Sequence, residues 1–241
     1  MNWFSNDALS VLSSRAGTLV ASETTLVRLV DGDELTQPQL VTLIAGSRNL
    51  RTLIILRWDF AAWNPESIQR IISSNALQSI HSLTLGWRGA LDMVAFFSML
   101  ADMPRLKRLA FGCICWAEGV DPSEPPDLPT PACALTHVLV NDDLGVSFAE
   151  YPRLLLSSRY SLSHFEAHWI NDPRPGIQLA EALETCRNVQ HLTLIGCIQF
   201  NHGRLLAACP KLRSLCIETD TLGLESEVRY IDPRIHGLTL D

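Results

Sequence analysis

The feature that most constrains the fold is a short apolar frame that recurs along most of the chain. An apolar residue is followed by two variable positions, a second apolar residue, one variable position and a third apolar residue. The first positions of eight copies lie 23 to 30 residues apart: Leu50, Ile80, Leu106, Leu135, Leu162, Val189, Leu212 and Ile235. A degenerate ninth copy is expected at Thr24, Val27 and Leu29. Alternating apolar positions indicate strands, and a fixed period of this length indicates a repeat architecture.

Apolar residues at helical spacing precede several frames, as in Leu40, Leu43 and Ile44. Pro104 and Pro210 follow two such runs, where a helix is expected to end. Each unit is therefore predicted to be strand, loop, helix, loop. One unit cannot bury its apolar face alone, so neighbouring units must stack. The sequence predicts an α/β solenoid, a horseshoe with a curved parallel sheet of eight or nine strands and with helices or irregular segments on its convex side.

Composition narrows the class of protein. With 47% hydrophobic and 19% charged residues over 241 positions, the chain is expected to form one domain, residues 1–241, and not to be disordered. A net charge of −7 disfavours nucleic-acid binding. No apolar run is long enough for a membrane span, and the N-terminus does not read as a signal peptide. Seven scattered cysteines suit reduced thiols in a cytoplasmic or nuclear protein.

The predicted domain has two irregular regions. Residues 1–22 are expected to cap the first strand, with a short amphipathic helix over Ala8–Arg15. Residues 118–131 contain five prolines, which exclude a helix, so this segment is predicted to be an extended insertion on the convex side and a solvated spacer. The last frame stops at Asp241 in mid-strand, which leaves open a bare final strand or a longer natural protein.

The variable strand positions point away from the apolar core and form the candidate site. One column of the frame places Arg108, His137, His164 and His191 on successive strands, with the histidines 27 residues apart. They are expected to stack at about one strand spacing. The further candidates are these: Glu166, His168, Thr193, Trp87 and Trp169. The two tryptophans follow their strands and are either binding hot spots or side chains buried under loops.

Three interpretations of this polar patch stay open. It is a protein-binding surface, in which rings supply contact area at low entropic cost. It is a pH-sensitive or anion-seeking patch, in which imidazoles beside Arg108 attract an acidic or phosphorylated partner segment. It is a zinc site formed by His137, His164, His191, His168 and Glu166. The third is disfavoured because parallel side chains on successive strands do not converge on one point.

The chain shows no motif of a known catalytic apparatus, neither a nucleophile elbow, nor a phosphate-binding loop, nor a helical zinc motif. Cys113 and Cys115 form a C-x-C that is expected to serve turn formation and packing. No catalytic residue, metal or cofactor is therefore predicted. A metal-dependent enzyme that uses the histidine patch is kept as the rival hypothesis.

Two segments carry a resemblance to a known family. His191-Leu-Thr-Leu-Ile-Gly-Cys197 and Leu205-Leu-Ala-Ala-Cys-Pro-Lys-Leu-Arg-Ser-Leu215 resemble leucine-rich repeats, specifically the cysteine-containing, ribonuclease-inhibitor-like repeats of fungal-type F-box proteins. The resemblance implies a non-enzymatic module that binds a protein partner on its concave face, for example as the substrate-reading part of an F-box-type ubiquitin-ligase adaptor. No F-box is recognisable in this chain, and the adaptor's docking segment is not evident. A standalone scaffold or inhibitor is the alternative.

Overall fold

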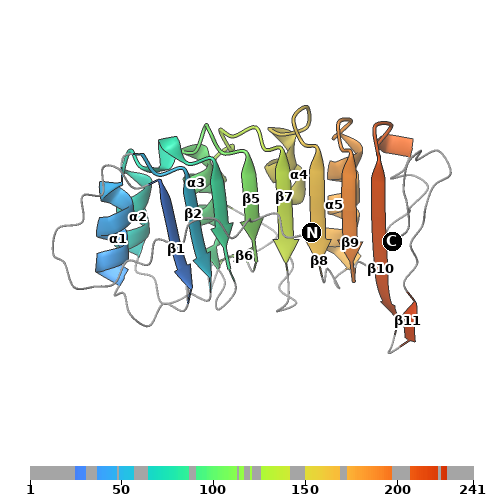
Figure 1. The fold of residues 1–241 in the computed structure, drawn as a ribbon, viewed down its shortest axis with the longest axis horizontal. Helices are drawn as coiled ribbons and strands as arrows, with labels where there is room; N and C mark the ends of the chain where they lie inside the picture. Colours follow the sequence, from blue (N-terminus) through green and yellow to red (C-terminus); the bar gives the residue numbers. More distant parts are fainter. Residues whose placement is uncertain are drawn as a thin grey trace.

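The computed structural model describes residues 25–30, 37–47, 49–56, 65–86, 91–112, 114–116, 120, 126–141, 150–168, 173–196, 207–221 and 224–226. Within these residues the chain is an α/β fold built on a mostly parallel sheet (Figure 1). The predicted class and the predicted parallel sheet are therefore confirmed.

The main sheet contains, among the described residues, nine strands whose spatial order follows their order in the chain. They are β1 (Leu26–Val30), β2 (Thr52–Leu56), β3 (Ser82–Leu85), β5 (Arg108–Phe111), β7 (His137–Asn141), β8 (His164–His168), β9 (His191–Ile195), β10 (Ser214–Thr221) and β11 (Leu224–Ser226). The pairs from β1 to β10 are parallel, and β11 pairs with β10 in antiparallel fashion. The degenerate copy of the frame is a real strand, β1, whose Val27 is buried.

The register of the sheet aligns the middle apolar residue of each frame across all the parallel strands. The aligned residues are Val27, Leu53, Leu83, Leu109, Val138, Phe165, Leu192 and Leu215. Each of them is at least 92% buried, since none has more than 8% of its surface exposed. The prediction that the frame's apolar residues point inward is confirmed, and the variable positions consequently lie on the opposite face, called here the outward face.

A repeated hydrogen-bond arrangement fixes where each strand begins. The carbonyl of Lys107 accepts the N–H groups of Thr136 and His137, at 2.8 and 3.1 Å. The carbonyl of Thr136 in turn accepts those of Ser163 and His164, both at 3.0 Å. The same double acceptance occurs at Thr25, Arg51, His81, Ser163 and Gln190. Because each unit sets the start of the next strand, side chains at equivalent outward positions are brought into line.

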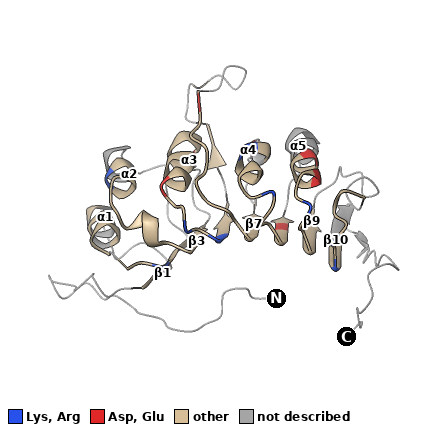
Figure 2. Cartoon of the chain, turned by 90° about the horizontal axis from the view of Figure 1, so that it is seen from above, with Lys and Arg blue, Asp and Glu red and all other residues tan. Residues whose placement is uncertain are grey.

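The helices lie on the inward face of the sheet, as Figure 2 shows from above. They are α1 (Gln37–Gly46), α2 (Pro65–Ile72), α3 (Met93–Ala101), α4 (Tyr151–Leu156) and α5 (Pro173–Glu184). The helical spacing noted in the sequence is confirmed at α1, α2 and α5. Asp92 caps α3, because its Oδ1 accepts the N–H of Ala95 at 2.9 Å. Phe96 and Phe97 of α3 are fully buried beneath the sheet.

Serine hydroxyls satisfy backbone groups in the turns that lead into the strands. Ser79 Oγ donates to the carbonyl of Leu50 at 2.7 Å, and Ser161 Oγ donates to that of Leu135 at 2.8 Å. The buried Ser158 accepts the N–H of Leu135 at 2.9 Å. Buried backbone groups need such partners, so these serines hold one unit against the unit before it.

A second, short sheet was not predicted. β4 (Leu91–Asp92) pairs in parallel with β6 (Ile114–Cys115), before α3 and after β5 respectively. Cys115 is half-buried in this pair. Cys113 lies outside the described residues.

The described end of the proline-rich segment, residues 126–131, forms neither helix nor strand, as predicted. It is not wholly a solvated spacer, however. Leu128 is buried, and Arg153 Nη1 donates to its carbonyl at 2.7 Å. The expected capping helix and the frame at Ile235 lie outside the described residues. Within the described part of the chain, none of the helices has the length and apolar character needed to cross a bilayer.

Candidate functional site

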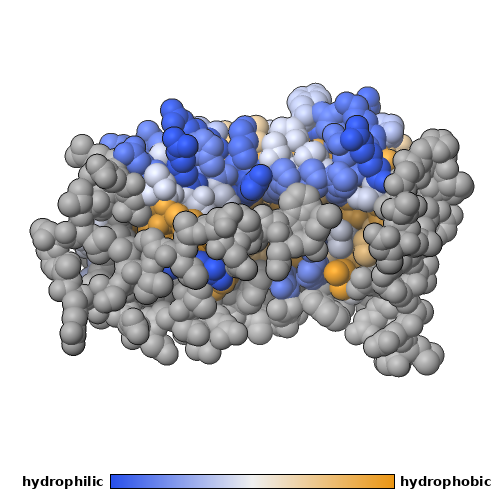
Figure 3. Space-filling model, viewed as in Figure 1, coloured by the Kyte–Doolittle hydropathy of each residue, from blue (hydrophilic) through white to orange (hydrophobic). Residues whose placement is uncertain are grey.

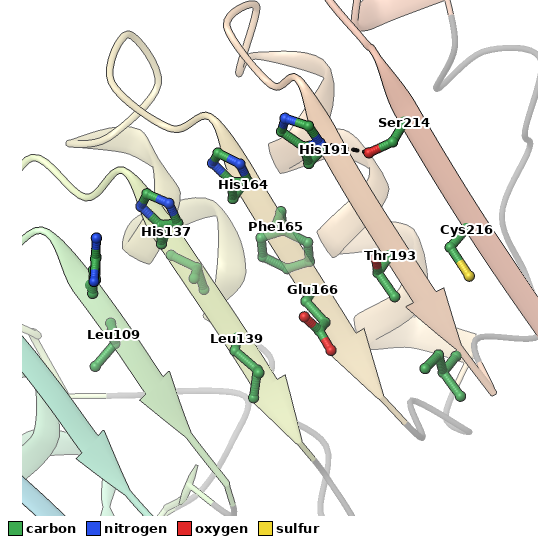
Figure 4. Close-up of a pocket in the computed structure, with 13 residues that line it drawn as sticks. Leu109, His137, Leu139, His164, Phe165, Glu166, His191, Thr193, Ser214 and Cys216 are labelled. Atoms are coloured by element: carbon green, nitrogen blue, oxygen red, sulfur yellow. Dashed lines mark hydrogen bonds between the residues drawn. The ribbon is translucent and has the colours of Figure 1, made fainter. Parts of the chain in front are cut away.

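Three histidines from successive strands form a parallel stack on the outward face. His137 of β7, His164 of β8 and His191 of β9 are aligned by the strand register. The ring centroids are 4.2 Å apart in both pairs, with interplanar angles of 5° and 8° (Figure 4). Arg108 of β5 precedes the stack in the same row, and Ser214 of β10 follows it. This five-residue row, called here the histidine row, confirms the predicted stacking.

Hydrogen bonds assign the tautomer of two of these rings. Thr136 Oγ1 donates its single hydrogen to the carbonyl of Lys107 at 3.0 Å and also lies 2.8 Å from His137 Nδ1. A hydroxyl has one hydrogen, so this oxygen must accept from an Nδ1–H group. Ser163 Oγ has the same relation to the carbonyl of Thr136, at 3.0 Å, and to His164 Nδ1, at 2.8 Å. Both neutral rings therefore carry their hydrogen on Nδ1 and their lone pair on Nε2.

The environment of the stack disfavours its protonated form. Burial lowers the pKa of His164 to about 4, with further contributions from the neighbouring rings and Arg108. Burial also lowers the pKa of His137, together with the charge of Arg108. The pKa of His191 is lowered by burial and by Arg213. At neutral pH the stack is uncharged, so it presents flat aromatic faces and nitrogen acceptors, while positive charge stays on the arginines beside it.

A second row runs parallel to the first, one step further along the strands. It consists of Leu139, Glu166, Thr193 and Cys216, which the register places side by side. Glu166 Oε1 accepts a hydrogen bond from His168 Nε2 at 2.6 Å, and both side chains are about one quarter exposed. The carboxylate is thus held in place by a side chain of its own strand.

The two rows line a pocket of about 360 Å³ on the outward face, spanning β5 to β10. Figure 4 shows the histidine row along one side and Glu166, Thr193 and Cys216 along the other. Its wall is mixed: Leu139 and Ile195 are apolar, whereas Glu166 and the imidazoles are polar. Such a mixture of apolar surface with a few fixed polar groups is typical of binding sites.

Most of the residues predicted for the site lie together in this pocket. The lining includes Arg108, His137, His164, Glu166, His191 and Thr193. His168 joins it through its bond to Glu166. Trp87 and Trp169 lie outside the described residues. Of the other tryptophans, Trp116 is half-buried against the core. The candidate list omitted Leu139, Ile195, Ser214 and Cys216, although all four occupy outward positions of the frame and could have been found by that signal.

The outward face is not open along its whole length. Ser82 and Thr84 of β3 were expected to face the groove, yet they are only 9% and 6% exposed. Thr84 Oγ1 is buried and makes no hydrogen bond to any of the described residues. At the end of this strand a Cβ on Gly86 would lie 2.9 Å from Leu56 Cδ2 and 3.2 Å from Leu56 Cα. The outward face is therefore closed over β3, whereas the outward residues of β2 and of β7 to β9 are partly exposed.

The geometry of the histidines differs from that of a metal site. Parallel rings do not converge on one ion, and the described residues contain no group of three or more side chains placed to hold a metal. Ser214 Oγ lies 2.6 Å from His191 Nδ1, as a nucleophile lies from its base. No carboxylate among the described residues is hydrogen-bonded to His191. A row of neutral rings beside a cation can, in contrast, bind an extended segment.

No protein-family model matches the sequence, and no curated protein matches it either.

Proposed function

We propose that this chain is a leucine-rich-repeat solenoid that acts as a non-enzymatic recognition module and binds a protein segment on its outward face. Strand order that follows chain order, helices confined to one face and the repeated double acceptance at each strand start support the repeat architecture. The observation that carries the function is the pocket of about 360 Å³ lined by the aligned, stacked histidines.

The physical basis of binding is a preorganised surface. The rings are held by stacking and by hydrogen bonds to Thr136, Ser163 and Ser214. A surface whose side chains are already ordered loses little entropy when a partner binds. Neutral aromatic rings and the apolar Leu139 and Ile195 offer area for burial, whereas Glu166 and the ring nitrogens select partners by hydrogen bonding.

A selection from a displayed peptide library tests this function. Peptides enriched on the purified chain should lose about tenfold in affinity for His164→Ala, because a ring at the centre of the pocket is removed. Thr52→Ala is the matched control, since Thr52 occupies the same frame column on β2, outside the pocket. Enrichment of no peptide, or equal losses for both variants, would contradict the proposal.

The cellular role we propose is that of the substrate-reading part of an F-box-type ubiquitin-ligase adaptor. This role is supported by the resemblance of the repeats. A partner that binds through the pocket and is ubiquitinated only when His164 is intact would support it. A partner whose ubiquitination is unaffected by His164→Ala would favour the standalone scaffold or inhibitor.

A further inference from the structure

The loops that lead into the strands carry an unusual excess of positive charge. Among the described residues of these loops and of the strand starts, eight lysines and arginines are all exposed, whereas the acidic residues there are the half-buried Asp102 and the exposed Asp127. The eight are Arg51, Arg105, Lys107, Arg108, Arg159, Arg187, Lys211 and Arg213. We call them the basic rim. Figure 3 shows hydrophilic residues along this upper edge, and Figure 2 looks down on it.

The basic rim contrasts with the composition of the whole chain, whose net charge is −7. Among the described residues, most of the lysines and arginines thus lie at one edge. Among the described residues, none of the eight side chains takes part in an ion pair; the described pairs join Arg153 to Glu150 and His168 to Glu166. At physiological salt, charges more than about 8 Å away are largely screened. A ligand at this edge therefore experiences the rim rather than the net charge.

The rim brackets the histidine row. Arg108 stands at one end of the row on β5, and Arg213 directly precedes Ser214 at the other end on β10. Both cations act on the rings between them: after burial, which is the larger cause, Arg108 lowers the pKa of His137 and Arg213 lowers that of His191. Four strand intervals separate β5 from β10, which corresponds to about 19 Å. An extended peptide of about six residues covers this distance.

Side-chain contacts hold parts of the rim in place. Lys211 Nζ donates to Asn188 Oδ1 at 2.6 Å, and Asn188 Nδ2 donates to the carbonyl of Tyr160. These bonds tie together the loops before β8, β9 and β10. Arg159 lies over the ring of Tyr160, 4.6 Å from its centroid. Ordered cations lose less entropy on binding than freely rotating ones do.

We propose that the partner of this site is an acidic protein segment that crosses the amino ends of β5 to β10, with carboxylates at both ends paired to the basic rim. This inference rests on the proposed function and names the chemistry of its ligand. The polarity of the pocket sets the orientation. Glu166 lies one row further from the rim and repels carboxylates, so the acidic groups stay at the rim while apolar side chains enter beside Leu139.

A protein segment fits the site better than a nucleic acid does. A phosphate backbone needs cations along its whole path. Here the cations are interrupted at β7, where Thr136 takes the position that Lys107 and Arg213 hold on their units, and the pocket contains the carboxylate of Glu166. Apolar wall residues between two groups of cations match a peptide with acidic ends and an apolar centre.

Fluorescence anisotropy with defined probes tests the inference. The probe is a labelled ten-residue peptide with two glutamates at each end and alanine, leucine and serine between them; its control carries glutamine in place of glutamate. We expect the glutamate peptide to bind at least about tenfold more tightly than the control. We also expect about tenfold weaker binding at 300 mM than at 50 mM salt, because exposed charge pairs are screened.

Two charge-neutralising variants locate the binding. Arg105→Gln/Lys107→Gln/Arg108→Gln and Arg187→Gln/Lys211→Gln/Arg213→Gln should each weaken the glutamate peptide about tenfold, at about twofold to threefold per charge. Arg70→Gln is the single-charge control, because Arg70 is exposed on α2, on the helix side of the sheet, and should change affinity less than any single rim substitution. Melting temperatures of all the variants verify that each is folded.

The outcomes separate the two proposals. If library peptides bind in a His164-dependent way but are not acidic and ignore the rim variants, the inference falls and the proposed function stands. If the glutamate peptide binds through the rim while no His164-dependent peptide exists, the proposed function is rejected. The preference of the basic rim for acidic segments is then retained. Tighter rim-dependent binding of a single-stranded RNA 20-mer, or of vesicles with about 30% phosphatidylserine, would overturn the inference in favour of that ligand.

Discussion

The two halves of the sheet share one backbone geometry and differ in what they present outward. On β3 and β5 the outward positions include the small residues Ser82, Thr84 and Ala110, and these three are buried. From β7 to β9 they carry histidines that remain accessible in a pocket. The parallel register continues unbroken from one half to the other. The comparison shows that the fold supplies a regular grid, and that side-chain choice on that grid decides which outward positions are accessible.

The largest expected effect tests the inward side of this grid. Leu192→Ala should lower the free energy of unfolding by about 2–5 kcal/mol, because Leu192 is 1% exposed and its truncation leaves a cavity. His164→Ala, at an outward position of the neighbouring strand, should change it by less than about 1 kcal/mol. Urea unfolding measures both. The reverse order of effects would mean that the faces of the strands are exchanged.

The next effect tests the closed part of the outward face, at the end of β3. Gly86→Ala should cost about 1–3 kcal/mol, because the added Cβ meets Leu56 at two atoms, one of them backbone. Leu56→Ala in the same protein should recover part of that loss, since it removes the Cδ2 contact. A double-mutant cycle by urea unfolding gives the coupling. A coupling of zero would show that Leu56 does not restrict this position.

A smaller effect tests how the ring of His164 is held in place on β8. Ser163→Ala removes the acceptor of the His164 Nδ1–H group and one bond to the carbonyl of Thr136. We expect a loss of about 0.5–1.5 kcal/mol in stability. Nitrogen-15 NMR of the imidazoles should show the Nδ1–H form of His164 in the parent chain and a mixture of tautomers in the variant. A parent ring in the Nε2–H form would contradict the assigned hydrogen bond.

The smallest effect is the pH dependence of stability that arises from His164. The pKa of His164 is about 4 in the folded chain against an ordinary value of 6.5, so between these values the unfolded chain binds more protons. Protonation of His164 therefore does not affect the free energy of unfolding above pH 6.5, and it lowers this free energy as the pH falls from 6.5 toward 4. Because solvent screens a partly exposed ring, we expect a Tm decrease of only about 2–4 °C between pH 7 and pH 5. His164→Gln should reduce this decrease, and an unchanged slope would assign it to other groups.

Much of the fold could be predicted because the frame repeats where strands occur. The inward alignment of Leu53, Leu83 and Leu109 follows from alternation of apolar residues. The β4–β6 pair could not be predicted, since strands of two residues carry no periodicity. The antiparallel β11 lies beyond the repeat pattern for the same reason: its three residues are not part of a frame.

The sequence predicted which side chains of the site stand in one row, but not how much of the outward face is accessible. Spacing of one repeat placed His137, His164 and His191 side by side, because the register preserves position within the unit. The burial of Thr84 was not predictable, since alternation identifies the face on which a side chain lies and says nothing about access to that face. The tautomers also required the structure, because they depend on hydroxyls such as Thr136 Oγ1 meeting a specific carbonyl.

The double acceptance at each strand start has a consequence for how such a surface can grow. Each carbonyl aligns only the unit that follows it, so alignment is passed on locally and needs no long-range fit. Duplicating the segment between two equivalent carbonyls would insert a whole unit and extend the stack by another imidazole at the same pitch. The length of the outward face can therefore change by gene duplication in whole steps, while the chemistry of each step changes by single substitutions.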